Sequence, residues 1–248
     1  MFPKIATMPD DVVIITQARM TSTRLPGKIL MRAGGRTLLE THLDRLAGVG
    51  VPVIVATTTN LSDGPVVELC AARDVPVFRG SENDVLERYQ GAARAHEARH
   101  VIRVTSDCPL ICPDVIRAGL DIYSGLKSES IYLSNADKRT YPRGMDFEIF
   151  SRRSLDFAAE NARLPSEREH VTGYIRTSMP GIRHEHCTDE DDLSDWRITV
   201  DTDDDFKLAR LLIEDYHAAE MNYPGLKALL KAHPELMKIN SHIQQKSI

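Results

Sequence analysis

The chain has 248 residues, of which 42% are hydrophobic and 27% charged, so it is long enough and apolar enough to bury a sizeable core. Its 31 lysines and arginines stand against 36 aspartates and glutamates, and the net charge of −5 argues against a general binder of nucleic acids or anionic membranes. No apolar run approaches the roughly 20 residues that span a bilayer, and residues 1–11 lack the apolar core of a secretory signal.

Short apolar runs alternate with amphipathic segments in the first half of the chain. Strands are expected at residues 12–16, 53–57, 76–79 and 100–105. Helices are expected at residues 37–46, 66–73 and 81–96, the last capped by Ser81, and a further helix begins at Pro113. This alternation predicts βαβ units and a mostly parallel sheet. Ligands collect at the carboxyl ends of such strands, here after Thr16, Thr57, Arg79 and Thr105.

The second half is less regular. Strands are expected at residues 146–150 and 197–200. Ser151 is expected to cap a helix to Arg163, and Thr202 a helix over residues 203–219.

The chain shows no internal repeat, low-complexity segment or linker. We therefore expect one domain over residues 11–240, with tails at residues 1–10 and 241–248. The cysteines form no paired CxxC pattern that would close a zinc site, so we expect reduced thiols in a cytoplasmic protein. They are Cys70, Cys108, Cys112 and Cys187.

The loop at residues 17–28 directly follows the first predicted strand. It carries Arg19, Arg24 and Lys28 with three hydroxyl side chains, and such a loop can offer Arg forks, hydroxyls and backbone N–H groups to a polyphosphate. It is not a Walker loop, because Ile29 follows Gly27-Lys28 where that motif requires Ser or Thr. The alternative is an exposed basic turn, which the position after a buried strand makes less attractive.

Two acidic residues follow predicted strands. If Asp107 and Asp201 meet at one edge of the sheet, their oxygens suit a hard cation, and Mg²⁺ is the usual choice where phosphates complete its shell. Alternatively Asp107 caps the next turn, and residues 203–205 form a charged helix N-terminus. We expect that second role for Asp204 and Asp205.

These segments belong to a series of motifs in chain order. The motifs are Ala18-Arg19 with Ser22-Thr23-Arg24-Leu25-Pro26-Gly27-Lys28, Asp107-Cys108-Pro109-Leu110, Val200-Asp201-Thr202-Asp203-Asp204-Asp205, and blocks at residues 78–89, 141–146 and 167–172. With them the chain resembles the nucleotide-sugar cytidylyltransferases, above all the spore-coat polysaccharide biosynthesis group. It is also similar to the enzymes that activate keto-deoxy-octulosonate and acylneuraminate.

The resemblance covers roughly residues 11–215 and implies both a fold and an activity. The implied fold is a single-domain three-layer α/β/α sandwich with a mostly parallel sheet, of the nucleotide-diphospho-sugar transferase (GT-A-like) type. The implied activity is transfer of CMP from CTP to an acidic sugar with release of pyrophosphate, in a Mg²⁺-dependent homodimer that takes part in surface polysaccharide or glycan synthesis.

Motif positions also imply roles for individual residues. The nucleotide would be bound by Ala18, Arg19, Ser22, Thr23, Arg24, Lys28, Thr57, Arg79 and Ser106. Asp107 and Asp201 would hold the metal and, with Arg19, Arg24 and Lys28, form the catalytic set. The acceptor would meet Asn135, Tyr141, Arg143, Glu148, Arg168, Glu169 and His170.

Several alternatives stay open at this level. Gln17 stands where the octulosonate enzymes carry proline, and Ser106 replaces a glycine, so the acceptor sugar is not fixed. His170 is either a general base or a structural histidine. The segment 184–187, with two histidines and a cysteine, is either a metal site or one polar strand face. Asp201-Thr202-Asp203 also fits a metal-dependent glycosyltransferase, and a non-catalytic nucleotide-binding partner is a third alternative.

Overall fold

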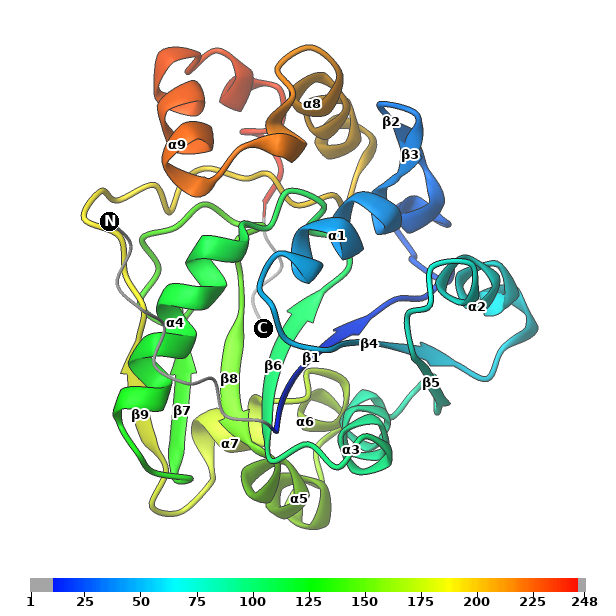
Figure 1. Ribbon diagram of the computed structural model, residues 1–248, viewed down its shortest axis with the longest axis vertical. Helices are drawn as coiled ribbons and strands as arrows, with labels where there is room; N and C mark the ends of the chain where they lie inside the picture. The colour runs from blue at the N-terminus through cyan, green and yellow to red at the C-terminus, as the bar shows by residue number, and fades with distance from the viewer. Residues whose placement is uncertain (1–10, 245–248) are drawn as a thin grey trace.

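The computed structural model describes residues 11–244, and this part of the chain contains a seven-stranded sheet in the order β5-β4-β1-β6-β8-β7-β9 (Figure 1). The strands are β1 (Val12–Gln17), β4 (Val53–Thr58), β5 (Val77–Gly80), β6 (His100–Thr105), β7 (Ile131–Ser134), β8 (Glu148–Ser151) and β9 (Arg183–His186). Strands β1, β4, β5 and β6 run parallel, whereas β8 is antiparallel to both of its neighbours. The mostly parallel sheet expected from the sequence is confirmed.

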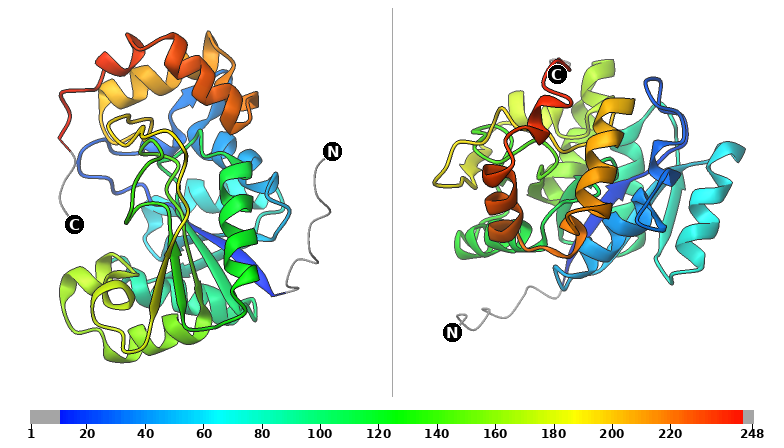
Figure 2. Two further views of the ribbon diagram at one scale, coloured as in Figure 1. Left: turned by 90° about the vertical axis from the view of Figure 1, so that its left-hand side faces the viewer. Right: turned by 90° about the horizontal axis from the view of Figure 1, so that it is seen from above.

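Helices cover both faces of the sheet and give three α/β/α layers (Figures 1 and 2). On one side lie α1 (Leu38–Ala47), α2 (Gly64–Ala71), α4 (Pro113–Gly125), α8 (Asp203–Glu214) and α9 (Tyr223–Ala232). On the other lie α3 (Val85–Ala95), α5 (Arg152–Asn161), α6 (Pro165–Glu169) and α7 (Gly173–Thr177). A small hairpin of β2 (Arg32–Ala33) and β3 (Arg36–Thr37) precedes α1.

Alternating side chains of the strands fill two cores, one on each face of the sheet. Val12 and Ile14 of β1 pack with residues of α4 and α8, while Val13 and Ile15 pack with residues of α3 and α5. This alternation follows from the two-residue period of a strand and explains why β1 is apolar on both faces. The expected single-domain sandwich is therefore confirmed.

Helix caps follow the expected chemistry at two positions and differ at a third. Ser151 and Thr202 accept hydrogen bonds from the backbone N–H groups of Ser154 and Asp205, as an N-cap should. Ser81 was expected to cap α3, but that expectation is wrong. Asp84 caps α3 instead, because its carboxylate accepts the Glu87 N–H at 2.9 Å, and Ser81 accepts the N–H of Asp84 itself.

The strand expected at residues 197–200 is also absent from the described sheets. This segment forms only an isolated bridge between Arg143 and Arg197, because its backbone bonds go to neighbouring loops. The Ile198 N–H donates to the Arg143 carbonyl, and the Val200 N–H donates to the Asp107 carbonyl, each at 2.8 Å. The helix expected over residues 203–219 ends earlier, at Glu214.

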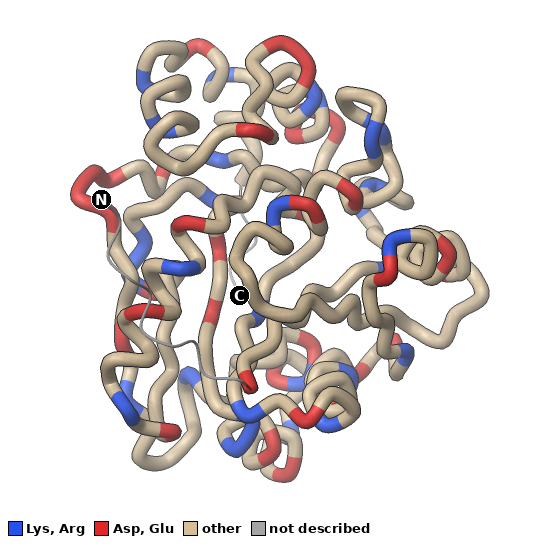
Figure 3. Tube along the Cα trace, viewed as in Figure 1, with Lys and Arg blue, Asp and Glu red and all other residues tan. Residues whose placement is uncertain are grey.

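The tail predicted at residues 1–10 and the last four residues of the tail predicted at 241–248 lie outside the described residues. Asn240, at the predicted domain boundary, is only 1% exposed. Within residues 11–244, no helix combines the length and apolar character needed to cross a bilayer. Acidic and basic residues are interspersed along the chain trace (Figure 3).

Candidate active site

A pocket of about 440 Å³ lies at the carboxyl ends of β1 and β6. The loop after β1 and the loop after β6 form one end of it, and residues from the 136–148 and 169–176 segments form the other. The predicted site residues that line this pocket are Arg19, Ser22, Thr23, Arg24, Lys28, Ser106, Asp107, Arg143, Glu148, Glu169, His170 and Asp201. Other predicted residues do not line it: Ala18, Thr57, Arg79, Asn135, Tyr141 and Arg168.

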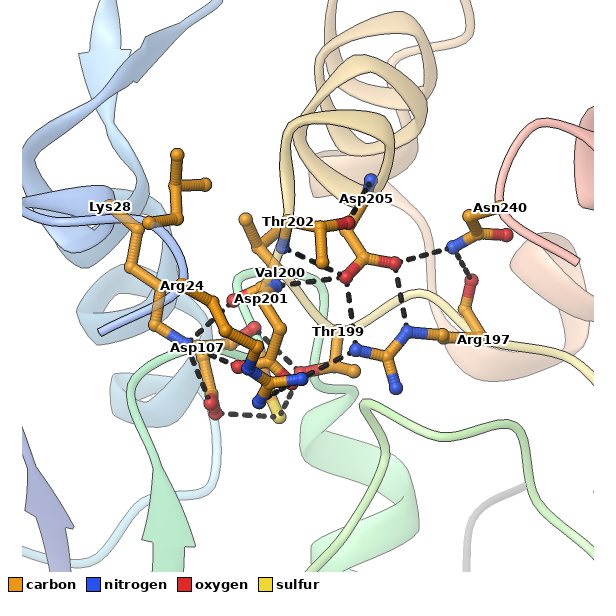
Figure 4. A network of polar contacts seen from close by, with 12 residues as sticks. Arg24, Lys28, Asp107, Arg197, Thr199, Val200, Asp201, Thr202, Asp205 and Asn240 are labelled. Carbon is orange, nitrogen blue, oxygen red and sulfur yellow. Dashed lines mark hydrogen bonds and ion pairs between the residues drawn. The ribbon is translucent and has the colours of Figure 1, made fainter. Parts of the chain in front are cut away.

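At one end of the pocket the ammonium group of Lys28 lies between two carboxylates (Figure 4). Its Nζ is 2.7 Å from Oδ1 of Asp201 and 3.0 Å from Oδ2 of Asp107. It also donates to the Val200 carbonyl at 2.7 Å. The two aspartates thus meet around one cation, although Asp201 follows a loop rather than the expected strand.

This close packing of charge changes the pKa values at the centre of the cluster. Burial alone would lower the pKa of Lys28, but the charges of Asp107 and Asp201 outweigh burial and leave that pKa above its ordinary value. Burial would likewise raise the pKa of Asp107, yet the Lys28 charge and the hydrogen bond from Thr105 bring it down to about 2. Lys28 and Asp107 therefore stay ionised at neutral pH.

A glycine turns the loop at residues 17–28 so that Lys28 enters the pocket. Gly27 has φ +69°, a left-handed conformation that glycine adopts without strain, and its N–H donates to the Met20 carbonyl at 3.0 Å. The Met20 N–H in turn donates to Oδ1 of Asp63 at 2.8 Å. Thr57 donates to the other oxygen of the buried Asp63, so Thr57 supports the loop from below rather than lining the pocket.

A second network holds Asp201 from the side that faces away from Lys28. Oδ2 of Asp201 lies 2.9 Å from Nη2 of Arg197, and also 2.9 Å from Nη2 of Arg24. The carboxylate of Asp205 receives Nε and Nη2 of the same Arg197 at 2.8 and 2.9 Å. Asn240 donates to Asp205 at 2.8 Å from the C-terminal segment (Figure 4).

Asp205 has the expected role at a helix N-terminus and a further role that was not expected. It lies in the first turn of α8, where its carboxylate accepts the N–H of the N-cap residue Thr202 at 3.1 Å, and it is also fully buried and pairs with Arg197. Asp204 fits the expectation, because it is partly exposed and pairs with Lys207 on the surface.

Arginines gather at the other end of the pocket, and carboxylates neutralise most of them. Ion pairs join Arg103 to Glu148, Arg139 to Asp146, and Arg176 to Asp137. Among the described residues no carboxylate forms an ion pair with Arg143, which is half-buried and lines the pocket. Burial and the charge of Arg139 lower the pKa of Arg143 from its ordinary value.

The Glu148 carboxylate binds several other side chains at this end of the pocket. Besides Arg103, it accepts hydrogen bonds from the hydroxyls of Tyr132 and Thr172, the latter at 2.7 Å. Burial would raise the pKa of Glu148, but the charge of Arg103 lowers it. Glu148 therefore remains an anion that is already fully hydrogen-bonded by the protein.

The predicted acceptor residues outside the pocket have other partners. Asn135 is buried and bridges the backbone of Met145 and Phe147. Tyr141 packs against Tyr223 with ring centroids 5.1 Å apart.

Two more predicted residues are bound away from the pocket. Arg168 forms an ion pair with Asp84 at the start of α3. Arg79 donates to the backbone carbonyls of Thr58 and Asn60.

Several pocket residues were not predicted from the sequence, and one of them carried a usable signal. Arg103 interrupts the apolar middle of strand β6, at residues 101–104, and a buried charge in a strand requires a partner such as Glu148. Arg139 and Arg176 lie in irregular or short helical segments and gave no such signal.

The donor set around Lys28 fits a hard cation. Two carboxylates already converge on a single positive charge in the pocket wall, and carboxylate oxygen is the ligand type that Mg²⁺ prefers. In residues 11–244, no group of three or more His, Cys, Asp or Glu side chains gathers in the manner of an all-protein metal site. A cation here would thus take its remaining ligands from substrate and water.

A family model described as cytidylyltransferase matches residues 13–178 of this chain, which include the loop at residues 17–28 and Asp107. The chain belongs to the cytidylyltransferase family. This membership makes it a CTP-dependent nucleotidyltransferase, and it agrees with the resemblance seen in the motifs.

Individual relatives of this cytidylyltransferase extend over most of its length. The spore coat polysaccharide biosynthesis protein SpsF of Bacillus subtilis is 28% identical, over 91% of this chain and 96% of that protein. A solved cytidylyltransferase from Leptospira borgpetersenii is 33% identical with a TM-score of 0.86, over 96% of this chain and 99% of that one. CMP:2-keto-3-deoxy-manno-octonic acid synthetase complexed with CTP shares the fold, with a TM-score of 0.60 and 18% identity, over 82% of this chain and 98% of that one.

Proposed function

We propose that this cytidylyltransferase transfers CMP from CTP to the hydroxyl of an acidic sugar and releases pyrophosphate. One observation carries the proposal: a single pocket holds the Lys28 cluster at one end and, at the other, Arg143, which forms no ion pair with the carboxylates of residues 11–244. The first end suits a triphosphate and a divalent cation. The second suits a carboxylate, because an arginine without a protein anion can form a bidentate pair with a ligand.

The nucleotide end provides cations from one loop. Arg19, Arg24 and Lys28 all line the pocket, and each can neutralise negative charge that grows on the leaving pyrophosphate. Ser22, Thr23 and Ser106 add hydroxyl groups to the same wall. The relative complexed with CTP shares the fold that presents this loop.

Asp107 and Asp201 would hold Mg²⁺, with phosphate oxygens completing its ligands. When bound, the ion would stabilise negative charge on the α-phosphate and lower the pKa of the acceptor hydroxyl. Lys28 lies between these carboxylates, so its ammonium group would have to move aside for an ion held by both of them. The ammonium group could then contact the phosphates.

CMP transfer depends mainly on how the protein positions the acceptor oxygen relative to the α-phosphorus of CTP. The acceptor oxygen forms a bond to the α-phosphorus of CTP, the bond to the bridging oxygen breaks, and the pyrophosphate leaves with that electron pair. The hydroxyl proton passes to a base or to water. His170 lines the pocket and is the residue that we assign to this step.

At the acceptor end of the pocket, Arg143 differs from the neighbouring arginines in its ion pairing. Arg103, Arg139 and Arg176 already have carboxylate partners, so Arg143 is the residue that we assign to the acidic group of the sugar. Glu169 lines the same region and offers an acceptor for sugar hydroxyls. The relationship to the spore coat polysaccharide biosynthesis protein SpsF supports a place in surface polysaccharide synthesis. We propose that the protein acts there as a cytoplasmic homodimer.

The glycosyltransferase alternative fits the pocket less well. A metal-binding Asp-x-Asp triplet needs both carboxylates at the site, but Asp203 is exposed and does not line the pocket that holds Asp201. The non-catalytic alternative predicts nucleotide binding without turnover.

The test is a pyrophosphate-release screen of the four nucleoside triphosphates against a panel of acidic sugars with Mg²⁺. We expect release only with CTP, and only with acceptors that carry a carboxylate. Arg143→Gln should raise KM for the acidic sugar at least tenfold while KM for CTP changes less than twofold. Release with neutral sugars, or an unchanged acceptor KM in the variant, would contradict the assignment of the acceptor end.

A further inference from the structure

The Asp201 carboxylate contacts two residues that line the pocket and one, Arg197, that does not. Its Oδ1 faces Lys28, and its Oδ2 contacts the guanidinium groups of Arg24 and Arg197. The Arg24 side chain is 33% exposed, whereas that of Arg197 is only 6% exposed. The fixed contact of Oδ2 is therefore the one with Arg197.

Asp205 fixes both Arg197 and the backbone that carries Asp201. Its carboxylate binds the Arg197 guanidinium in a two-point pair, at 2.8 and 2.9 Å. Oδ2 of Asp205 also accepts the N–H groups of Asp201 and Thr202, at 3.0 and 3.1 Å. One buried carboxylate thus orients the main chain and the side-chain partner of Asp201 together.

The side-chain amide of Asn240, near the end of the described residues, joins this network. Nδ2 of Asn240 donates to Oδ1 of Asp205 at 2.8 Å and to the backbone carbonyl of Arg197 at 3.0 Å. Figure 4 shows Asn240 reaching the pair from the far side of Arg197, away from Lys28 and the pocket. Asn240 is 1% exposed and does not line the pocket, so its amide acts on the protein alone.

We propose that Asn240 is a positioning residue for catalysis, which sets the orientation of the Asp201 carboxylate through Asp205 and Arg197. The inference rests on the proposed function, in which Asp201 binds the divalent cation. Buried ion pairs contribute little net stability but do restrict geometry, and partners behind a metal ligand commonly change metal affinity 10–100-fold. Loss of the Asn240 amide should therefore loosen Asp201 and weaken the binding of the ion.

The experiment compares Asn240→Ala with Ser241→Ala, a matched control in the same segment. Ser241 is exposed, and its hydroxyl donates to the backbone carbonyl of Lys238. The readout is the dissociation constant of Mn²⁺ in the presence of CTP, measured by electron paramagnetic resonance at a temperature where each variant is folded. We expect about tenfold weaker Mn²⁺ binding in Asn240→Ala and no change in Ser241→Ala.

Further measurements separate positioning from a purely structural role. The CTP dissociation constant without metal should change less than twofold in Asn240→Ala, and the Mg²⁺ concentration for half-maximal pyrophosphate release should rise with the Mn²⁺ constant. A lower melting temperature with unchanged Mn²⁺ affinity would overturn the proposal. Asn240→Ser keeps one hydrogen-bond donor and should have a Mn²⁺ affinity between those of wild type and Asn240→Ala. This variant tests the proposal if Asn240→Ala does not fold.

The wild-type protein distinguishes failure of this inference from failure of the proposed function. If wild type binds no Mn²⁺ with CTP, the metal-dependent function itself is wrong. If wild type binds Mn²⁺ and Asn240→Ala binds it equally well, only the positioning role is wrong.

Discussion

Lys28 and Asp201 are 173 positions apart in the sequence, yet the Lys28 ammonium group donates to Oδ1 of Asp201 at 2.7 Å. The same ammonium group reaches Asp107, so one lysine holds together two carboxylates from different loops. This relationship places a protein cation where a divalent cation would bind. The role of each charged residue can therefore be tested by measuring metal binding without nucleotide and turnover with nucleotide.

Lys28→Ala should have opposite effects on metal binding and on turnover. Removing the ammonium frees both carboxylates, so Mn²⁺ should bind more tightly to the nucleotide-free protein. Turnover should fall roughly 100-fold or more, because a charge donor to the triphosphate is lost. Mn²⁺ titration and pyrophosphate release measure the two effects. Lys207→Ala, which removes a surface partner of Asp204, serves as the control and should change neither.

Asp107→Asn and Asp201→Asn should each abolish Mg²⁺-dependent pyrophosphate release, and the losses should not add. Both carboxylates contact the same ammonium group, and a shared ion would make them act as one unit. The measurement is a double-mutant cycle across a Mg²⁺ titration. Additive losses would show that the two aspartates serve separate sites.

Asp205→Asn and Asp204→Asn should differ strongly although the two residues are neighbours. Asp205 is buried against Arg197, and the loss of its charge leaves that guanidinium without its two-point partner. We expect Asp205→Asn to lower the free energy of unfolding by about 3 kcal/mol. Asp204→Asn should change it by no more than about 0.5 kcal/mol. Urea denaturation of both variants gives the comparison, and equal effects would contradict the buried role of Asp205.

His42 should make the stability of the protein depend on pH. The side chain is fully buried between the Thr16 hydroxyl and the Cys108 carbonyl, and burial lowers its pKa to about 4. The unfolded chain, with an ordinary pKa of about 6.5, then binds more protons between these values, so stability falls as pH falls through this window. Between pH 7 and pH 5 we expect a loss of about 2 kcal/mol from this residue.

The measurement for His42 is urea denaturation at a series of pH values. The difference in stability between wild type and His42→Gln should shrink by this amount from pH 7 to pH 5. A constant difference would show that the His42 pKa is the same in the folded and unfolded states.

Local sequence patterns predicted the order of the strands and helices and the position of the loop at residues 17–28. Buried parallel strands are apolar along their whole length, and their β-branched runs marked β1, β4 and β6 to within one residue. The loop with Arg19, Arg24 and Lys28 follows β1 directly, so the general rule for parallel sheets located it at the pocket. These features depend on neighbours in the sequence, which is why the sequence determined them.

Only the tertiary structure decided which charges meet. Asp204 and Asp205 look alike in sequence, but the helical turn exposes the first and buries the second beside Arg197. Asn240 completes that pair from a segment with no sequence signal. Arg143 differs from Arg139 because Asp146 pairs with the latter. Such distinctions depend on which groups are desolvated together, and residues far apart in the sequence come into contact only when the sheet and its loops have formed.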